Sequence, residues 1–309
     1  CRGDWGEQSA GSLSGILVEY TVRWRILILV FATVSEVRAA LPDISTVKPD
    51  LVVPALVDGK PGAGRRVKEV LPQYEGTGVY HVLYLPKDWR PGQRYPVVVE
   101  YAGNGPYRNR NRDISSGRVE GSRMGYGISG GESYIWLCLP YLNGRGTANV
   151  RRWWGSKPEY DARPTVSYCL EAVKHICAQF GGDRERLVLC GFSRGAIACN
   201  FIGLYDDRVA GLWRAFIPYS HYDGARQWEY PGSDQASALQ RLRRLGSRPQ
   251  FVCSEGSQFK ETAQYLIESG VKGNFTFRGT GFRNHSDAWL LRPSRTRSEL
   301  RSWLGEVLK

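Results

Sequence analysis

Short apolar runs recur at long intervals along the chain. They occupy residues 96–101, 134–139, 187–190, 215–219, 250–253 and 275–277. Continuous runs of this length, without alternation of apolar and polar positions, are typical of strands buried on both faces of a sheet. Two earlier runs, 66–71 and 79–86, are separated by the turn residues 75–78 and predict an antiparallel hairpin.

Helical periodicity fills several intervals between these runs. Apolar residues from Val166 to Phe180 follow one face of a helix, which predicts a helix over residues 164–180, and residues 300–307 show the same spacing. Strands that alternate with helices predict an α/β fold: a mostly parallel, doubly wound sheet with helices on both faces, preceded by the antiparallel N-terminal hairpin. Residues 102–131 show no such period, and so long a loop in one domain is usually functional.

The N-terminal segment has the layout of an export signal. Arg23 and Arg25 precede an apolar run at 26–34, and Val37 and Ala39 occupy the −3 and −1 positions of a small-residue cleavage site. We therefore expect residues 1–39 to be an extended start followed by a secretory signal peptide. The remainder, 40–309, is predicted to be a single domain that is secreted or periplasmic.

Composition narrows the range of partners. The net charge is +12, but the basic residues are scattered and lie in no nucleic-acid-binding motif, so no nucleic-acid partner is expected. No run of about 18 apolar residues exists, so no membrane association beyond export is expected. The four histidines are dispersed, and no Cys-x-x-Cys pair or phosphate-binding loop is present, so neither a metal nor an organic cofactor is predicted. The cysteines after Cys1 are expected to be free and buried.

Residues 191–195 read Gly-Phe-Ser-Arg-Gly, a Gly-x-Ser-x-Gly motif centred on Ser193. The motif supplies a nucleophile only where a strand turns sharply into a helix, because that turn lifts the hydroxyl above the sheet edge. A buried-strand run precedes Ser193, and small residues suited to a closely packed helix follow it. A second match at 127–131 has a polar loop before Ser129 and a strand after it. Ser193 is therefore the predicted nucleophile, and Ser129 is predicted to be a loop serine.

A serine hydroxyl needs a base that accepts its proton. In a fold where a strand turns into a helix at such a serine, the triad follows the order serine, acid, histidine, whereas His81 and His175 precede Ser193. His285 lies in a polar loop directly after the last predicted strand, at the sheet edge where the nucleophile is expected. His285 is thus the predicted base, and His221 is predicted to line the pocket.

Two acids are candidates for the third member of a triad. Asp223 follows the strand at 215–219, and Glu255 follows the strand at 250–253. Either could reach the imidazole from a strand end and hold its tautomer. The position after the penultimate strand slightly favours Glu255, and both residues remain candidates.

An oxyanion in the transition state needs two backbone N–H donors. One is expected from Arg194, directly after the nucleophile. The second is expected from the Ala-Gly-Asn-Gly turn after the first core strand, where Gly103, Asn104 and Gly105 allow close approach of the backbone. The side chain of Asn104 is a possible further donor.

With these elements in place, residues 66–309 resemble the α/β-hydrolase superfamily. The Tyr-Leu-Pro strand end at 84–86, the run at 95–99 and the Gly-Asn-Gly turn resemble secreted esterases of the polyhydroxybutyrate depolymerase and feruloyl or acetylxylan esterase type. Two features depart from that group. A long polar loop follows the oxyanion turn in place of a helix, and Glu255 stands where the group usually has an aspartate.

The motifs and the resemblance together predict a secreted serine esterase that forms an acyl-enzyme on Ser193. Aromatic and histidine side chains at the carboxyl ends of strands predict a pocket for a small-molecule or polysaccharide-linked ester, such as an acetyl or feruloyl ester, or for a polyester. These predicted substrate-binding residues are Trp153, Trp154, His221 and Tyr222. A serine peptidase of the prolyl-oligopeptidase type and a non-catalytic binding protein of the same fold are the alternatives.

Overall fold

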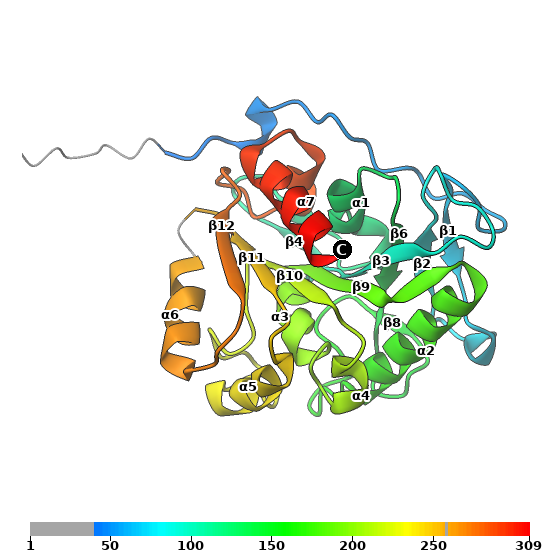
Figure 1. Cartoon of the computed structure of the whole chain (residues 1–309). Helices are drawn as coiled ribbons and strands as arrows, with labels where there is room; N and C mark the ends of the chain where they lie inside the picture. Colours follow the sequence, from blue (N-terminus) through cyan, green and yellow to red (C-terminus); the bar gives the residue numbers. More distant parts are fainter. Residues whose placement is uncertain (1–39, 257–258) are drawn as a thin grey trace, which may run out of the picture. The chain divides into compact units, whose positions relative to one another are not determined.

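A computed structural model describes residues 40–256 and 259–309, in which eight strands form one central sheet. The order across the sheet is β1-β2-β6-β3-β9-β10-β11-β12 (Figure 1). These strands span Arg66–Glu69 (β1), His81–Tyr84 (β2), Tyr95–Tyr101 (β3), Ile135–Leu139 (β6), Gly182–Phe192 (β9), Ala215–Tyr219 (β10), Gln250–Ser254 (β11) and Phe275–Gly279 (β12). Neighbouring strands from β6 to β12 are parallel, whereas β2 is antiparallel to β1 and β6. The predicted hairpin and mostly parallel sheet are confirmed.

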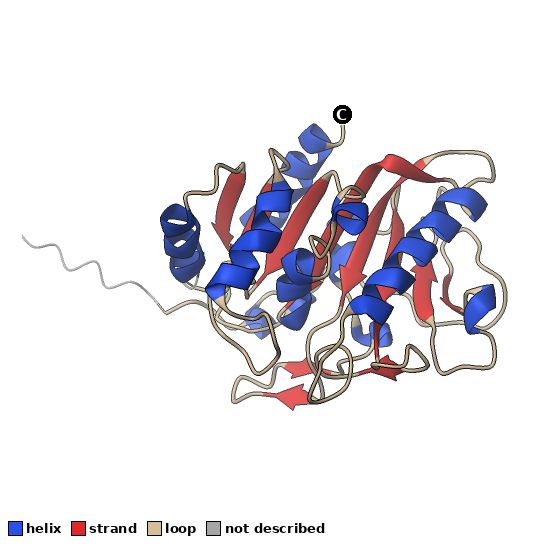
Figure 2. Ribbon diagram, turned by 90° about the horizontal axis from the view of Figure 1, so that it is seen from below, coloured by secondary structure: helices blue, strands red, loops and turns tan. Residues whose placement is uncertain are grey.

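Helices cover both faces of this sheet. The α-helices span Met124–Ser129 (α1), Arg163–Gln179 (α2), Arg194–Phe201 (α3), Asp207–Ala210 (α4), Gln235–Leu242 (α5), Phe259–Ser269 (α6) and Arg295–Val307 (α7). Short 3-10 helices span Ile44–Thr46, Pro72–Tyr74, Val119–Gly121, Arg243–Leu245 and Asp287–Leu291. Helices α1 and α7 lie on one face, and α2 to α6 lie on the other (Figures 1 and 2). The helix predicted over 164–180 corresponds to α2, and the predicted C-terminal helix corresponds to α7.

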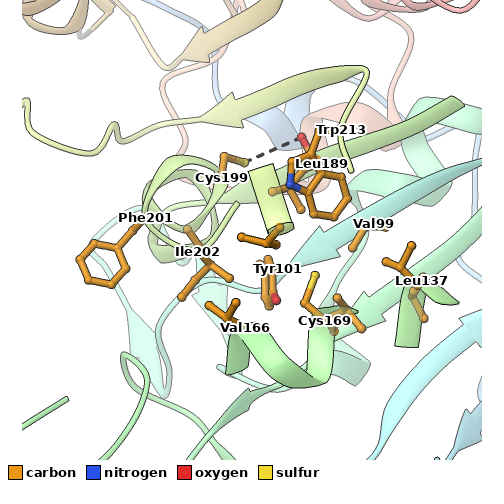
Figure 3. Close-up of a cluster of buried hydrophobic side chains, with 14 of the residues drawn as sticks. Val99, Tyr101, Leu137, Val166, Cys169, Leu189, Cys199, Phe201, Ile202 and Trp213 are labelled. Atoms are coloured by element: carbon orange, nitrogen blue, oxygen red, sulfur yellow. Dashed lines mark hydrogen bonds between the residues drawn. The ribbon is translucent and has the colours of Figure 1, made fainter. Parts of the chain in front are cut away.

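Alternate side chains of β3 and β9 enter two separate cores, because successive residues of a strand point to opposite faces. Val99 and Leu189 belong to the core beneath α2 and α3, whereas Val98 and Val188 belong to the core beneath α1 and α7. Figure 3 shows the first of these cores, where Val99 and Leu189 from the sheet gather with Val166 of α2. Burial of each such side chain stabilises the fold by about 1.5–3 kcal/mol. Burial on both faces explains why the strands lack an apolar–polar alternation.

The cysteines are part of this packing. All six cysteines of the described residues are free; five are buried, and Cys177 is half-buried. Cys169 and Cys199 lie in the core of Figure 3, where the Cys199 thiol lies 3.9 Å from the carbonyl oxygen of Leu189. The prediction of free, buried cysteines is confirmed, apart from the partial exposure of Cys177.

The predicted loop at 102–131 contains regular structure that its sequence does not reveal. It holds α1 and a two-stranded hairpin, Tyr107–Arg108 (β4) and Ile114–Ser115 (β5); a second hairpin, Tyr141–Leu142 (β7) and Asn149–Val150 (β8), follows β6. The interpretation of Ser129 as a loop serine is wrong, since Ser129 ends α1 and Gly130 caps that helix in the left-handed conformation. Helix α1 is too short and too rich in glycine to display a period.

Helix α1 begins instead at a buried carboxylate. Glu100 of β3 accepts hydrogen bonds from the backbone N–H groups of Arg123, Met124 and Gly125 at distances of 2.8–3.2 Å, and from Trp136 Nε1 at 2.8 Å. A negative charge at this position satisfies the free N–H groups of the first helical turn and interacts favourably with the helix dipole.

The predicted extended start and signal peptide lie outside the described residues, and the division of the chain at residue 40 stays a prediction. No helix in the described part of the chain is both long and apolar enough to cross a membrane.

We expect Glu100→Gln to lower the free energy of unfolding by about 2–3 kcal/mol at pH 8, above the pKa of about 7 to which burial raises this carboxyl group. Each carboxylate oxygen accepts two N–H groups, so an amide NH₂ would face donors in either orientation. Urea denaturation followed by tryptophan fluorescence measures the change. The exposed Glu159→Gln is the matched control, and an equal loss in both variants would contradict the assigned role of Glu100.

Candidate active site

Ser193 occupies a strained turn between β9 and α3. Its backbone has φ 57° and ψ −113°, a combination that non-glycine residues adopt only when the surroundings impose it. The backbone N–H of Ser193 donates to the carbonyl oxygen of Tyr219 at 3.0 Å, which ties the turn to β10. A Cβ atom on Gly191 would collide with the backbone of Gly195, and one on Gly195 would collide with the carbonyl oxygen of Tyr101. Both motif glycines are therefore required by close packing.

His285 follows β12, and its side chain is hydrogen-bonded to that of Glu255, which follows β11. The distance from His285 Nδ1 to Glu255 Oε1 is 2.7 Å. A carboxylate can only accept, so Nδ1 carries the proton and Nε2 keeps its lone pair. Burial opposes ionisation of Glu255, but the hydrogen bond and the charge interaction with His285 prevail and lower its pKa. The pair is therefore arranged for Nε2 to accept a proton.

Asp223, the other candidate acid, has a different partner. Its carboxylate forms a bidentate pair with Arg241 of α5, with N–O distances of 2.8 and 3.0 Å, and both side chains are largely buried. Burial raises the pKa of Asp223, and Arg241 opposes this rise. Of the two acids, the structure brings Glu255 to the imidazole and leaves Asp223 in an ion pair apart from it.

Two residues that the sequence interpretation missed also contact His285. Ser220 Oγ lies 2.8 Å from His285 Nδ1 and donates to Glu255 Oε1 at 3.1 Å. Ser220 has φ 87°, a strained value for a serine. Asp113, between β4 and β5, accepts the backbone N–H of His285 at 2.9 Å. Neither residue lies in a motif, so the only signal for Ser220 is its position at the end of a core strand.

Ser193 and His285 line one pocket of about 350 Å³, which we call the serine pocket. Its other lining residues are Asn104, Tyr107, Ser115, Trp153, Phe192, Arg194, His221, Arg226, Trp228 and Glu255. The Ser193 hydroxyl makes no hydrogen bond with any described residue. In sites without a substrate, such hydrogen bonds are often long and tighten only when the substrate binds.

The Arg194 side chain holds the turn that was predicted to bind the oxyanion. Its guanidinium group donates to the carbonyl oxygens of Ala102, Gly103, Gly117 and Trp153 at 2.7–3.3 Å. The side chain is fully buried and forms no ion pair with a described residue; burial lowers its pKa to about 10, so it stays charged at neutral pH. The sequence interpretation used only the backbone N–H of Arg194 and missed this role of its side chain.

The backbone N–H groups near Ser193 differ in availability. Those of Gly103, Asn104 and Arg194 have no hydrogen-bond partner among the described residues, whereas Gly105 N–H donates to the carbonyl oxygen of Arg151 at 2.9 Å. Gly105, a predicted donor, is therefore occupied. Asn104 Oδ1 accepts the backbone N–H of Trp153 at 2.8 Å, which leaves the side-chain NH₂ of Asn104 as a donor.

The predicted aromatic residues separate into two groups. Trp153 and His221 line the serine pocket beside Trp228, whose ring centroid lies 5.4 Å from that of Trp153 and 5.3 Å from that of His221. Trp154 and Tyr222 do not line it, because both are buried in the core. The Trp154 ring stacks on Phe201 at 4.3 Å, and Tyr222 donates to Gln250 Oε1 at 2.7 Å. Runs of adjacent aromatic residues do not indicate which ring faces solvent.

His221 is a neutral acceptor at the pocket wall. Its Nδ1 lies 2.9 Å from the carbonyl oxygen of Ser220, so Nδ1 carries the proton. Burial, followed by the charge of His285, lowers the pKa of His221 to about 4. Among residues 40–256 and 259–309, no group of three or more histidine, cysteine, aspartate or glutamate side chains could hold a metal ion.

Known proteins match this chain in fold. No family matches the sequence, and no curated protein matches it. An S-formylglutathione hydrolase from Agrobacterium tumefaciens is 14% identical, with a TM-score of 0.53 over 79% of this chain and 95% of its own. A protein from Bacteroides ovatus assigned as a dipeptidyl aminopeptidase IV is 13% identical, with a TM-score of 0.53 over 78% of this chain and 35% of its own. A thermostable esterase is 18% identical, with a TM-score of 0.45 over 78% of this chain and 62% of its own.

The chain thus spans less than two thirds of the esterase and about a third of the Bacteroides protein. With the sheet order described above, the likenesses to the S-formylglutathione hydrolase and to the Bacteroides protein establish that the chain has the α/β-hydrolase fold, as the sequence predicted.

We expect Asp223→Asn to lower the free energy of unfolding by about 3 kcal/mol or more, because it leaves the buried guanidinium of Arg241 without its counter-charge. Denaturant unfolding measures this loss. Asp207→Asn is the matched control, since it removes a carboxylate that pairs with Arg244 at the surface and should change stability little. Similar losses in the two variants would show that the Asp223–Arg241 pair does not behave as a buried ion pair.

Proposed function

We propose that the protein is a serine hydrolase that cleaves carboxylic esters through an acyl-enzyme on Ser193. The observation that carries this proposal is the hydrogen-bonded pair of His285 and Glu255, which lines the same pocket as the strained Ser193. A serine with an adjacent histidine, itself oriented by a carboxylate, forms a nucleophile and base of the triad kind. The α/β-hydrolase fold agrees with this reading but does not establish it.

In the proposed reaction the Ser193 oxygen attacks the ester carbonyl carbon while His285 Nε2 takes the hydroxyl proton. The ionised Glu255 stabilises the imidazolium that results. Collapse of the tetrahedral intermediate breaks the bond to the alcohol oxygen, which leaves with the proton from His285. A water molecule then attacks the acyl group with His285 again as base, releasing the carboxylic acid and restoring Ser193.

The negative charge on the former carbonyl oxygen would be stabilised by backbone N–H groups. The unpartnered donors beside Ser193 are those of Arg194 and of Gly103 and Asn104. The Arg194 side chain would support this hole indirectly, by holding the carbonyl oxygens of the same turn. Fixed donors of this kind typically contribute a factor of about 10²–10³ to the rate.

The wall of the serine pocket favours an aromatic or sugar-linked ester. Trp153, Trp228 and the neutral His221 offer flat apolar faces and, at His221, an acceptor for a substrate hydroxyl. Cleavage of a feruloyl or acetyl ester on a polysaccharide, outside the cell, fits this wall and the predicted signal peptide. The same site chemistry would also suit a serine peptidase, and the Bacteroides protein of the same fold is assigned as a dipeptidyl aminopeptidase.

We expect the purified protein to hydrolyse p-nitrophenyl acetate, and Ser193→Ala, His285→Ala and Glu255→Gln each to lower kcat/KM by about 10³-fold or more. Loss of the nucleophile or base removes covalent catalysis, and Glu255→Gln disturbs the imidazole tautomer. Ser129→Ala, in the second copy of the motif, is the matched control and should keep full activity.

Activity that survives Ser193→Ala would overturn the proposed nucleophile. Hydrolysis of dipeptidyl p-nitroanilides in preference to esters would favour the peptidase alternative. A folded protein with no activity that also resists fluorophosphonate labelling at Ser193 would favour a non-catalytic binding protein.

We expect Trp228→Ala to raise KM for methyl ferulate by about tenfold while changing KM for p-nitrophenyl acetate by less than about twofold, because in the proposed binding mode the aromatic wall contacts the acyl group, and an acetyl group is too small to reach it. Steady-state kinetics with both substrates measure this difference in KM. Trp89→Ala, a half-buried tryptophan outside this pocket, is the control for general loss of stability. A parallel change for both esters would exclude an acyl-binding role for Trp228.

A further inference from the structure

A second hollow of about 610 Å³ lies beyond the β4–β5 hairpin, and we call it the arginine hollow. The arginines that line it are Arg110, Arg112, Arg123, Arg283 and Arg292. Only two carboxylates, Asp43 and Asp113, line it with them. The hollow therefore combines a large open volume with a strong excess of positive charge.

Both lining carboxylates already have partners. Asp43 pairs with Arg283 at 2.9 Å and accepts the backbone N–H of Ser45. Asp113 accepts the side-chain NH₂ groups of Asn109 and Asn284 at 2.8 and 2.9 Å, as well as the backbone N–H of His285. Asp113 is thus saturated by neutral donors and makes no ion pair with a described arginine.

The remaining arginines are poorly compensated. Arg292 is half-buried, and its guanidinium donates to the carbonyl oxygens of Val47 and Ala288 at 2.8 Å. It forms no ion pair with a carboxylate of the described residues. Arg123 has only a 3.7 Å contact with Asp287. Burial and then repulsion from Arg123 lower the pKa of Arg292, whereas the charge of Asp43 opposes this lowering.

Arginine groups gathered in this way match one class of ligand. A guanidinium group presents a planar fork of N–H donors that fits the oxygens of a sulfate, phosphate or carboxylate group. The exposed Arg110 and Arg112 make no ion pair with a described residue, so their donors are open to solvent at the rim. We propose that the arginine hollow is a binding site for an anionic group of this class, either as a free ion or as a substituent of a longer molecule.

The two pockets are neighbours. Tyr107 and Ser115 of the hairpin line the serine pocket, whereas Ile114, between them in the same hairpin, lines the arginine hollow. Asn284 lines the hollow, and the adjacent His285 lines the serine pocket. If the ester hydrolysis proposed above is correct, an acidic substituent on a substrate chain could occupy the hollow while its ester lies at Ser193.

Isothermal titration with sodium sulfate, at an ionic strength matched with sodium chloride, tests the site. The protein carrying Ser193→Ala is used throughout, so binding is measured without turnover and failure of the proposed esterase leaves the result intact. We expect the double variant Arg123→Gln/Arg292→Gln to weaken sulfate binding by at least about tenfold and Arg110→Gln by about threefold. Arg243→Gln, at an exposed position outside the hollow, should bind as before.

Unchanged sulfate affinity in the double variant, or no binding by the starting protein, would overturn the proposal. If the double variant fails to fold, sulfate binding by the Arg110→Gln variant tests the proposal instead, because the exposed side chain of Arg110 supports no packing. Two further titrations, with oligogalacturonate and with galacturonate, distinguish an anionic substituent of a longer molecule from a single free anion. Binding at least about tenfold tighter than that of galacturonate indicates a substituent on a chain, whereas equal affinities indicate a single group.

Discussion

One buried cation holds together the loops that form the serine pocket. The Arg194 guanidinium donates to carbonyl oxygens of Ala102 and Gly103 in the turn after β3, of Gly117 and of Trp153, and its centre lies 3.8 Å from the centroid of the Tyr141 ring. A buried charge without a counter-ion is costly unless all its donors are satisfied. The three segments therefore cannot separate independently, and the position of the turn opposite Ser193 depends on them. The residue next to Ser193 thus helps build the pocket that Ser193 lines.

Buried carboxylates perform distinct tasks in this fold because each has a different partner. Glu100 satisfies the N–H groups that begin α1, Asp223 compensates Arg241, and Glu255 orients His285. The chemistry of the three side chains is nearly the same, so burial alone does not distinguish them. Glu100 and Asp223 are held by N–H groups and a guanidinium, which can only donate, whereas Glu255 faces an imidazole that also has a lone pair to accept a proton.

The β4–β5 hairpin belongs to the long loop after β3, and its residues line two different pockets. Its residues contribute to the wall of the serine pocket and to the arginine hollow, and Asp113 fixes the backbone of His285. The long loop therefore contacts the proposed base and carries three arginines of the hollow, Arg110, Arg112 and Arg123.

The sequence by itself determined the sheet, the two long helices and the turn at Ser193, because burial on both faces, helical period and motif glycines are all local patterns. Tertiary structure alone decided which acid meets His285, since Asp223 and Glu255 both follow core strands and differ only in partners from distant elements. It also decided that Trp154 is buried in the core, and that the first turn of α1 is capped by the carboxylate of Glu100, about two dozen residues earlier in the chain. Such contacts join residues far apart in the chain, so no local pattern records them.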